Sequence, residues 1–196
     1  MNITTDLIET LNLKTETNRR SFLKTGLIVG AAAQLWSPTG AAARSFVNSG
    51  RSIQMYNAHT GETFKGEYWA DGRYHSDAFR EIKALFRDHR TNDIFPIDPR
   101  LIDILYVLHT RTGSEKPFRL FSGYRSPTTN RKLKRLTSGV AENSLHMLGQ
   151  AVDLRLPGTN LRKLQKDAIA LKAGGVGYYP DSHFLHLDTG RVRHWS

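Results

Sequence analysis

The first 43 residues have the pattern of an export signal, so the folded part of the chain is shorter than its 196 residues. Arg19 and Arg20 are adjacent and are followed by Ser-Phe-Leu-Lys, an order typical of twin-arginine signals. A weakly apolar stretch over residues 25–36 comes next, and the small residues Ala41 and Ala43 suit a signal peptidase. We therefore predict that residues 1–43 are a twin-arginine signal peptide, cleaved after Ala43. The alternative is an amphipathic N-terminal helix that is retained.

Residues 44–196 then remain to fold, which is a length typical of one domain. The chain is 39% hydrophobic, which is enough to bury a core and excludes a wholly disordered basic tail. No run of about 18 apolar residues occurs, so we expect no stable membrane anchor after cleavage. The twin-arginine export machinery would deliver this domain to the periplasm of a Gram-negative bacterium.

Charge and cysteine content narrow the choice of partners and chemistry. Lys and Arg number 28 against 18 Asp and Glu, a net charge of +10, which favours an acidic partner such as nucleic acid or a cell-wall polymer. Because the predicted export would remove the protein from the cytoplasm, we do not expect nucleic acid as its partner. Cysteine is absent, so thiolate ligands and thiol nucleophiles are excluded, and any metal site must use His, Asp or Glu.

Local patterns predict an α+β fold with helices packed on a small antiparallel sheet. A Thr-Gly pair at residues 60–61 between β-branched and aromatic runs indicates a hairpin. We expect one helix capped by Ser76, one with inward-facing Leu133 and Leu136, and one ended by Gly174 and Gly175. The expected helix starts are Ser76, Asp98-Pro99, Ser126-Pro127 and Asn160, and the expected later strands are 117–121, 148–156, 176–179, 184–188 and 192–195.

Three polar residues in the C-terminal half can form a metal site. Asp153 lies on the polar face of the strand predicted at 148–156, and it meets His186 if that strand pairs with the strand at 184–188. His146, before a bend at Gly149, can then reach over as a third ligand. Two imidazoles and one carboxylate leave a fourth tetrahedral position for a water molecule, as in catalytic zinc sites. Zinc lowers the pKa of such a water toward about 7. The alternative is three polar residues in unrelated loops.

The same residues carry a resemblance to a known family. The pattern Ser-x-His-x-x-Gly-x-Ala-x-Asp over residues 144–153 resembles the D-Ala-D-Ala-carboxypeptidase-like zinc peptidases, grouped with lysostaphin-type enzymes and the hedgehog domain. The wider sequence is more similar to the murein endopeptidase K group. The resemblance implies a hedgehog-like fold whose sheet carries zinc on His146, Asp153 and His186. Further matching segments are His59-Thr60-Gly61-Glu62, Arg87-Asp88-His89-Arg90, Ser122-Gly123-Tyr124-Arg125-Ser126-Pro127, residues 174–180, His186-Leu187-Asp188-Thr189-Gly190 and Arg193-His194-Trp195.

The resemblance also implies an enzyme that hydrolyses the peptide cross-links of peptidoglycan through a zinc-activated water. It places Arg125 at the site, where a guanidinium can bind a substrate carboxylate or the developing oxyanion. Ser144 either binds substrate or steadies the loop of His146, and Asp188 either orients a ligand imidazole or belongs to a strand-end turn. His183 occupies the position where carboxypeptidase relatives carry a glutamate as general base. We therefore predict His183 as the base, with Asp188 or a water-linked residue as the substitute.

Two other functions stay open from the sequence. One is a D,D- or L,D-carboxypeptidase that trims stem peptides, and the other is a non-catalytic peptidoglycan-binding module. The sequence does not distinguish 3-3 from 4-3 cross-links as the substrate.

Overall fold

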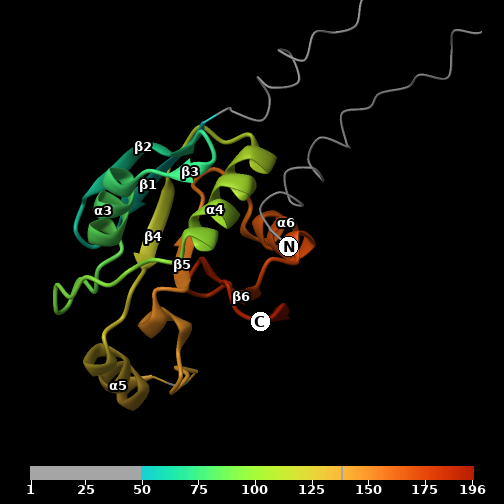
Figure 1. The fold of residues 1–196 in the computed structure, drawn as a ribbon. Coiled ribbons are helices and arrows are strands. Elements are labelled where there is room, and N and C mark those ends of the chain that lie inside the picture. The colour runs from blue at the N-terminus through green and yellow to red at the C-terminus, as the bar shows by residue number, and fades with distance from the viewer. Residues whose placement is uncertain (1–49, 138) are drawn as a thin grey trace, which may run out of the picture. The chain divides into compact units, whose positions relative to one another are not determined.

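One eight-stranded sheet organises the part of the chain that this computed structural model describes, residues 50–137 and 139–196 (Figure 1). The predicted signal peptide and its cleavage site lie outside the described residues. Within the described ranges, no helix has both the length and the apolar character that crossing a bilayer requires. The strands are β1 (Arg51–Asn57), β2 (Thr63–Ala70), β3 (Arg73–Tyr74), β4 (Phe118–Ser122), β5 (Ala151–Arg155), β6 (Gly175–Tyr179), β7 (Phe184–Asp188) and β8 (Arg193–Trp195).

The sheet is larger than predicted, and it is mixed rather than antiparallel. Its strand order is β3-β2-β1-β4-β5-β7-β6-β8, with parallel pairing of β1 with β4 and of β6 with β8. The other neighbours are antiparallel. The connection from the first hairpin to β4 is long enough to carry two helices, and only such a crossover allows a parallel pair. The α+β class is thus confirmed, and the small antiparallel sheet is corrected.

Three helices pack on one face of the sheet: α3 (Ser76–Leu85), α4 (Pro99–Thr112) and α6 (Leu161–Leu171). Tyr68 of β2 contacts Phe79 of α3 and Tyr106 of α4 through edge-to-face rings, which places both helices on the same side. The strands send alternate apolar side chains toward these helices. The fully buried members in the central strands include Phe118, Leu120, Val152, Leu154, Leu185 and Leu187.

The remaining helix, α5 (Pro127–Leu136), follows β4 and lies apart from the other helices in Figure 1. This position explains why the prediction for Leu136 is wrong: its side chain is 68% exposed. Leu133 is half-buried. The residues that lead into α5 lie beside β5, so they can contribute to a site on the sheet.

The predicted helix starts are confirmed where a side chain caps the helix. Asp98, Ser126 and Asn160 each accept a hydrogen bond from a backbone N–H of the first turn. The predicted start at Ser76 is also confirmed, since α3 begins there, but Ser76 is not the cap: the residue before α3 is His75, whose side chain makes no capping hydrogen bond. The predicted end of the last helix is wrong. Helix α6 ends on Lys172 in a left-handed conformation, before Gly174.

The strand predicted over 148–156 begins only at Ala151. Leu148 belongs instead to a short 3-10 helix, η2 (Leu145–Leu148), where it is 55% exposed. All residues from Ala151 to Leu154 are buried, including Asp153 at 9% exposure. The polar face predicted for β5 is therefore covered by neighbouring side chains, which include those of the site described next.

Candidate metal centre

His146, Asp153 and His186 meet on the face of the sheet that lies away from α4 and α6. Asp153 of β5 is directly opposite His186 of β7 in the antiparallel register, as the sequence predicted. Their Oδ1 and Nδ1 atoms are 2.9 Å apart. His146 Nε2 lies 3.3 Å from the same carboxylate oxygen and 3.2 Å from His186 Nδ1. One ligand atom from each residue thus converges on a common point.

The other nitrogen of each ring is occupied. His146 Nδ1 donates to the carbonyl oxygen of Gly123 at 2.7 Å, and His186 Nε2 donates to Asp188 Oδ2 at 3.0 Å. A carbonyl and an ionised carboxylate only accept hydrogen bonds, so these two nitrogens carry the ring protons. When the rings are neutral, their remaining nitrogens direct lone pairs at each other and at the Asp153 oxygen. Three acceptors this close need a proton or a metal cation between them.

The spacing of the three donors fits a tetrahedral metal. Ligands about 2.0–2.1 Å from zinc would lie about 3.3–3.4 Å from one another. The observed separations of 2.9, 3.3 and 3.2 Å come within a few tenths of an ångström of that value. Two imidazoles with one carboxylate are also a donor set of catalytic zinc sites. The cluster can accordingly hold a metal ion with one coordination position left over.

The electrostatics of the cluster favour positive charge at this point. Burial opposes protonation of His186, but hydrogen bonds to Asp153 and Asp188 and the charges of both carboxylates outweigh it and raise its pKa to about 9. Burial likewise opposes ionisation of Asp153, yet the two imidazoles hold its pKa well below the ordinary value. The same field that stabilises a proton here stabilises a metal cation.

Local sequence explains how His146 comes to point at β5. Ser144 caps η2, and its Oγ accepts the backbone N–H of His146 at 3.4 Å. Gly149 ends η2 with φ +64°, and a Cβ there would lie 2.0 Å from the carbonyl oxygen of Pro96. The chain can therefore turn sharply from His146 into β5. Of the two roles expected for Ser144, the structure shows the local contact, and a contact with substrate stays a prediction.

Arg125 lies next to the cluster. Its Nη2 is 3.6 Å from Asp153 Oδ2, and its Nη1 donates to Asn130 Oδ1 at 3.3 Å. Its Nε is buried and has no hydrogen-bond partner among the described residues. Burial lowers the pKa of Arg125, although the charge of Asp153 opposes that shift. A largely buried cation with an unused donor is thus available beside the ligands.

A segment with no role assigned from the sequence supports the loop of Arg125. Asp88 accepts hydrogen bonds from both the backbone N–H and the hydroxyl of Ser126, at 3.0 and 2.8 Å. Burial would raise the pKa of Asp88, but these and further hydrogen bonds lower it to about 2. The N–H of Tyr124 also donates to the carbonyl of Phe86. Phe86 and Asp88 therefore hold the residues on both sides of Arg125.

Asp188 has more partners than the sequence indicated. Besides His186 it accepts from the backbone N–H groups of Gly175 and Gly190. Arg193 donates to both of its oxygens, at 3.0 and 2.7 Å. Burial opposes ionisation of Asp188, but the hydrogen bond from His186 and that from Arg193 hold its pKa well below the usual range. This carboxylate lies where it can orient the ring of His186 toward the cluster.

The structure does not bring His183 into the cluster. His183 is exposed, lies in the turn between β6 and β7, and has a left-handed φ of 54°. It borders a hollow of about 380 Å³ together with Arg155 and residues 156–159 and 161. Its proposed role in proton transfer is therefore not supported by a contact with the ligands and stays a prediction.

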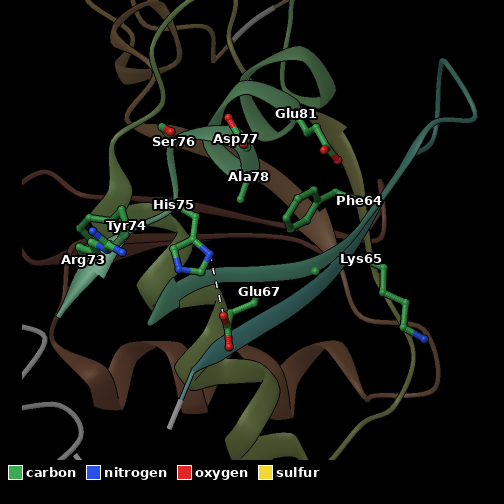
Figure 2. A pocket seen from close by; sticks show the side chains of 11 residues that line it. Phe64, Lys65, Glu67, Arg73, Tyr74, His75, Ser76, Asp77, Ala78 and Glu81 are labelled. Atoms are coloured by element: carbon green, nitrogen blue, oxygen red, sulfur yellow. Dashed lines mark ion pairs between the residues drawn. The ribbon is translucent and has the colours of Figure 1, made fainter. Parts of the chain in front are cut away.

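A second hollow lies elsewhere on the molecule. It has a volume of about 510 Å³ and is formed by β2, β3 and the start of α3 (Figure 2). His75 Nδ1 lies 3.9 Å from Glu67 Oε1 in this hollow. No residue of the metal cluster borders it, so it does not belong to the metal centre.

Comparison with known proteins agrees with the geometry. A family model described as "Peptidoglycan L,D-endopeptidase MepK" matches residues 45–195. The protein of that name from Escherichia coli (strain K12) is 44% identical over 183 residues, 93% of this chain and 99% of the relative; the Shigella flexneri protein gives the same values. A "Probable peptidoglycan L,D-endopeptidase MepK" from Haemophilus influenzae is 36% identical over 179 residues, 91% of this chain and 95% of the relative. The predicted likeness to the murein endopeptidase K group is thus confirmed: the chain belongs to the MepK family of peptidoglycan endopeptidases.

Proposed function

We propose that this peptidoglycan endopeptidase depends on zinc held by His146, Asp153 and His186, and that it cuts L,D bonds. The main support is the convergence of two imidazole lone pairs and a carboxylate oxygen within 3.3 Å of one another. Zinc bound there would polarise the scissile carbonyl and lower the pKa of a water molecule toward about 7. The specificity for L,D bonds rests on the names of the relatives.

The chain's own residues would prepare the site. The carbonyl of Gly123 and the carboxylate of Asp188 hold the ligand rings in the tautomers that metal binding needs. Arg125 would bind a substrate carboxylate or stabilise negative charge on the scissile carbonyl oxygen, since its guanidinium lies beside Asp153. Of these residues, only Arg125 is proposed to contact the substrate.

Digestion of defined muropeptides tests the function. We expect the purified protein to split 3-3 cross-linked dimers into monomers, since the bond between two diaminopimelate residues is an L,D bond, and to leave 4-3 dimers intact. A chelator should stop the reaction, and added zinc should restore it. Mass spectrometry separates the outcomes: removal of a terminal residue alone would indicate a carboxypeptidase, and unchanged muropeptides would indicate a binding module. Cleavage that persists in excess chelator would contradict the zinc proposal.

The general base needs its own experiment. Because His183 does not contact the ligands, a role in proton transfer requires the turn at residues 180–183 to rearrange when substrate binds. If His183 is the base, His183→Ala should retain zinc and lose about a hundredfold or more in kcat. Exposed His194 offers a matched control, and His194→Ala should leave both quantities unchanged. A near-normal rate for His183→Ala would remove His183 from the mechanism.

We also propose that the enzyme acts in the periplasm after twin-arginine export. Changing Arg19 and Arg20 together to Lys should retain the precursor in the cytoplasm, because that machinery recognises the paired arginines. Lys14→Arg, outside the pair, serves as the control. In the wild type the mature N-terminus should be Arg44, as read by mass spectrometry of the periplasmic protein. Normal periplasmic amounts of the double variant would show that another route exports the chain.

A further inference from the structure

Two arginines face each other across neighbouring strands beside the metal centre. Arg119 of β4 is directly opposite Arg155 of β5 in the antiparallel register. Arg155 follows Asp153 by two residues, so strand alternation places both guanidinium side chains on the face that carries the metal ligands. Directly opposed like charges destabilise a sheet. Strand pairing therefore gives no reason for this arrangement.

No carboxylate among the described residues neutralises the pair. Within residues 50–137 and 139–196, neither guanidinium forms an ion pair, and Arg119 Nε is buried without a hydrogen-bond partner. Aromatic rings contact them instead. Arg119 lies 5.8 Å from the ring centres of Tyr56 and Phe121, and Arg155 lies 5.5 Å from that of Phe121. Such contacts hold a guanidinium in place but leave its N–H donors free for an anion.

There is space for a ligand next to Arg155, the partner of Arg119 across the two strands. Arg155 borders the hollow of about 380 Å³ whose other walls include Pro157, Thr159 and His183. Arg119 and Arg155 are each only half-buried, so solvent and ligands can reach them. An open recess bordered by a guanidinium that forms no ion pair among the described residues is a suitable form for a carboxylate-binding subsite.

We propose that Arg119 and Arg155 together bind a stem-peptide carboxylate that is remote from the scissile bond. This inference rests on the proposed function, because it takes the metal ligands as marking the point of cleavage. Along β5, Arg155 is about 7 Å from Asp153, which is the length of about two extended residues of a bound peptide. Stem peptides carry free carboxylates at this range, on the γ-linked glutamate and on diaminopimelate. Two guanidinium groups can bind such a carboxylate through several charge-assisted hydrogen bonds.

Kinetics on amidated substrates test the subsite. We expect Arg119→Ala and Arg155→Ala each to lower kcat/KM at least about tenfold on 3-3 dimers with free carboxylates, the scale of one lost charge-assisted hydrogen bond. The wild type should lose a similar factor on dimers amidated at the bound carboxylate. On those dimers the variants and the wild type should become equal. Amidation at glutamate alone, or at diaminopimelate alone, identifies which carboxylate is bound.

Arg162 provides a matched control. It also stacks on an aromatic ring, 4.6 Å from the ring centre of Tyr178, but it projects from α6. Arg162→Ala should keep the wild-type kcat/KM on every substrate. Equal losses for Arg119→Ala and Arg155→Ala on free and amidated dimers, or no loss at all, would overturn the subsite.

A binding measurement separates failure of the subsite from failure of the proposed function. Calorimetry of the zinc-loaded protein with the uncross-linked tetrapeptide requires no bond cleavage. We expect the wild type to bind it, each arginine variant to bind it at least about tenfold more weakly, and the Arg162→Ala control to bind it normally. If the proteins bind in this way but the wild type cuts no cross-link, the result supports the subsite and contradicts the proposed function. Arginine variants that bind as tightly as the wild type contradict the subsite, whatever the cleavage result.

Discussion

Replacing any one of the three proposed zinc ligands should remove zinc and activity together. We expect His146→Ala, Asp153→Ala and His186→Ala each to contain far less than one zinc per chain. Hydrolysis of cross-linked muropeptides should fall by roughly a thousandfold or more, because the polarisation that the metal supplies is worth several kcal/mol. Each substitution also leaves the other two lone-pair donors facing each other without a cation. Elemental analysis of the purified variants, together with muropeptide digestion, measures both effects.

Two further variants make this result specific. Asp188→Asn keeps the shape of the side chain that accepts from His186 Nε2 but removes its charge, so it should weaken metal affinity by about 10–100-fold, as measured by competition with a chelator. His194→Ala, at an exposed position on β8, should retain full zinc content. Normal zinc in all three ligand variants would refute the assignment of the metal centre.

The ligand cluster was predictable because it depends on local rules. Alternation fixes the face on which a strand side chain lies, and one pairing of two short strands then brings Asp153 opposite His186. The bend at Gly149 brings His146 back to the same point. The caps at Asp98 and Ser126 were predictable for the same reason, since the hydrogen bond spans only two or three residues.

The contacts around the cluster were not predictable, because they join distant segments. Asp88 and Ser126 are separated by 38 residues, and no periodicity marks either of them. The parallel pairing of β1 with β4 also depends on a crossover whose path the sequence pattern does not encode. His183 shows the same limit. Its position relative to His186 suggested a catalytic role, but spacing along the chain did not indicate the left-handed turn that places it at the hollow beside Arg155, so its role stays a prediction.

Arg125→Ala should separate substrate activation from metal binding. The three ligands are unchanged in this variant, so we expect wild-type zinc content. We also expect a loss of about 10²–10³ in kcat/KM, the scale of one donor to a developing oxyanion. Arg125→Lys should recover only part of the loss, because an ammonium keeps the charge but lacks the planar fork that reaches Asn130 and the substrate at once. Zinc analysis and steady-state kinetics on 3-3 dimers provide both measurements.

Whether Arg125→Ala changes KM or kcat identifies what Arg125 binds. A substrate carboxylate is bound before and during the reaction, so losing that contact should raise KM with little change in kcat. An oxyanion exists only in the transition state, so losing its donor should lower kcat and kcat/KM alike. Arg131 on α5, exposed and hydrogen-bonded only to Thr128 among the described residues, gives the control, and Arg131→Ala should have wild-type constants. An Arg125→Ala enzyme with full zinc and wild-type constants would mean that Arg125 only neutralises Asp153, from which it is separated by 3.6 Å.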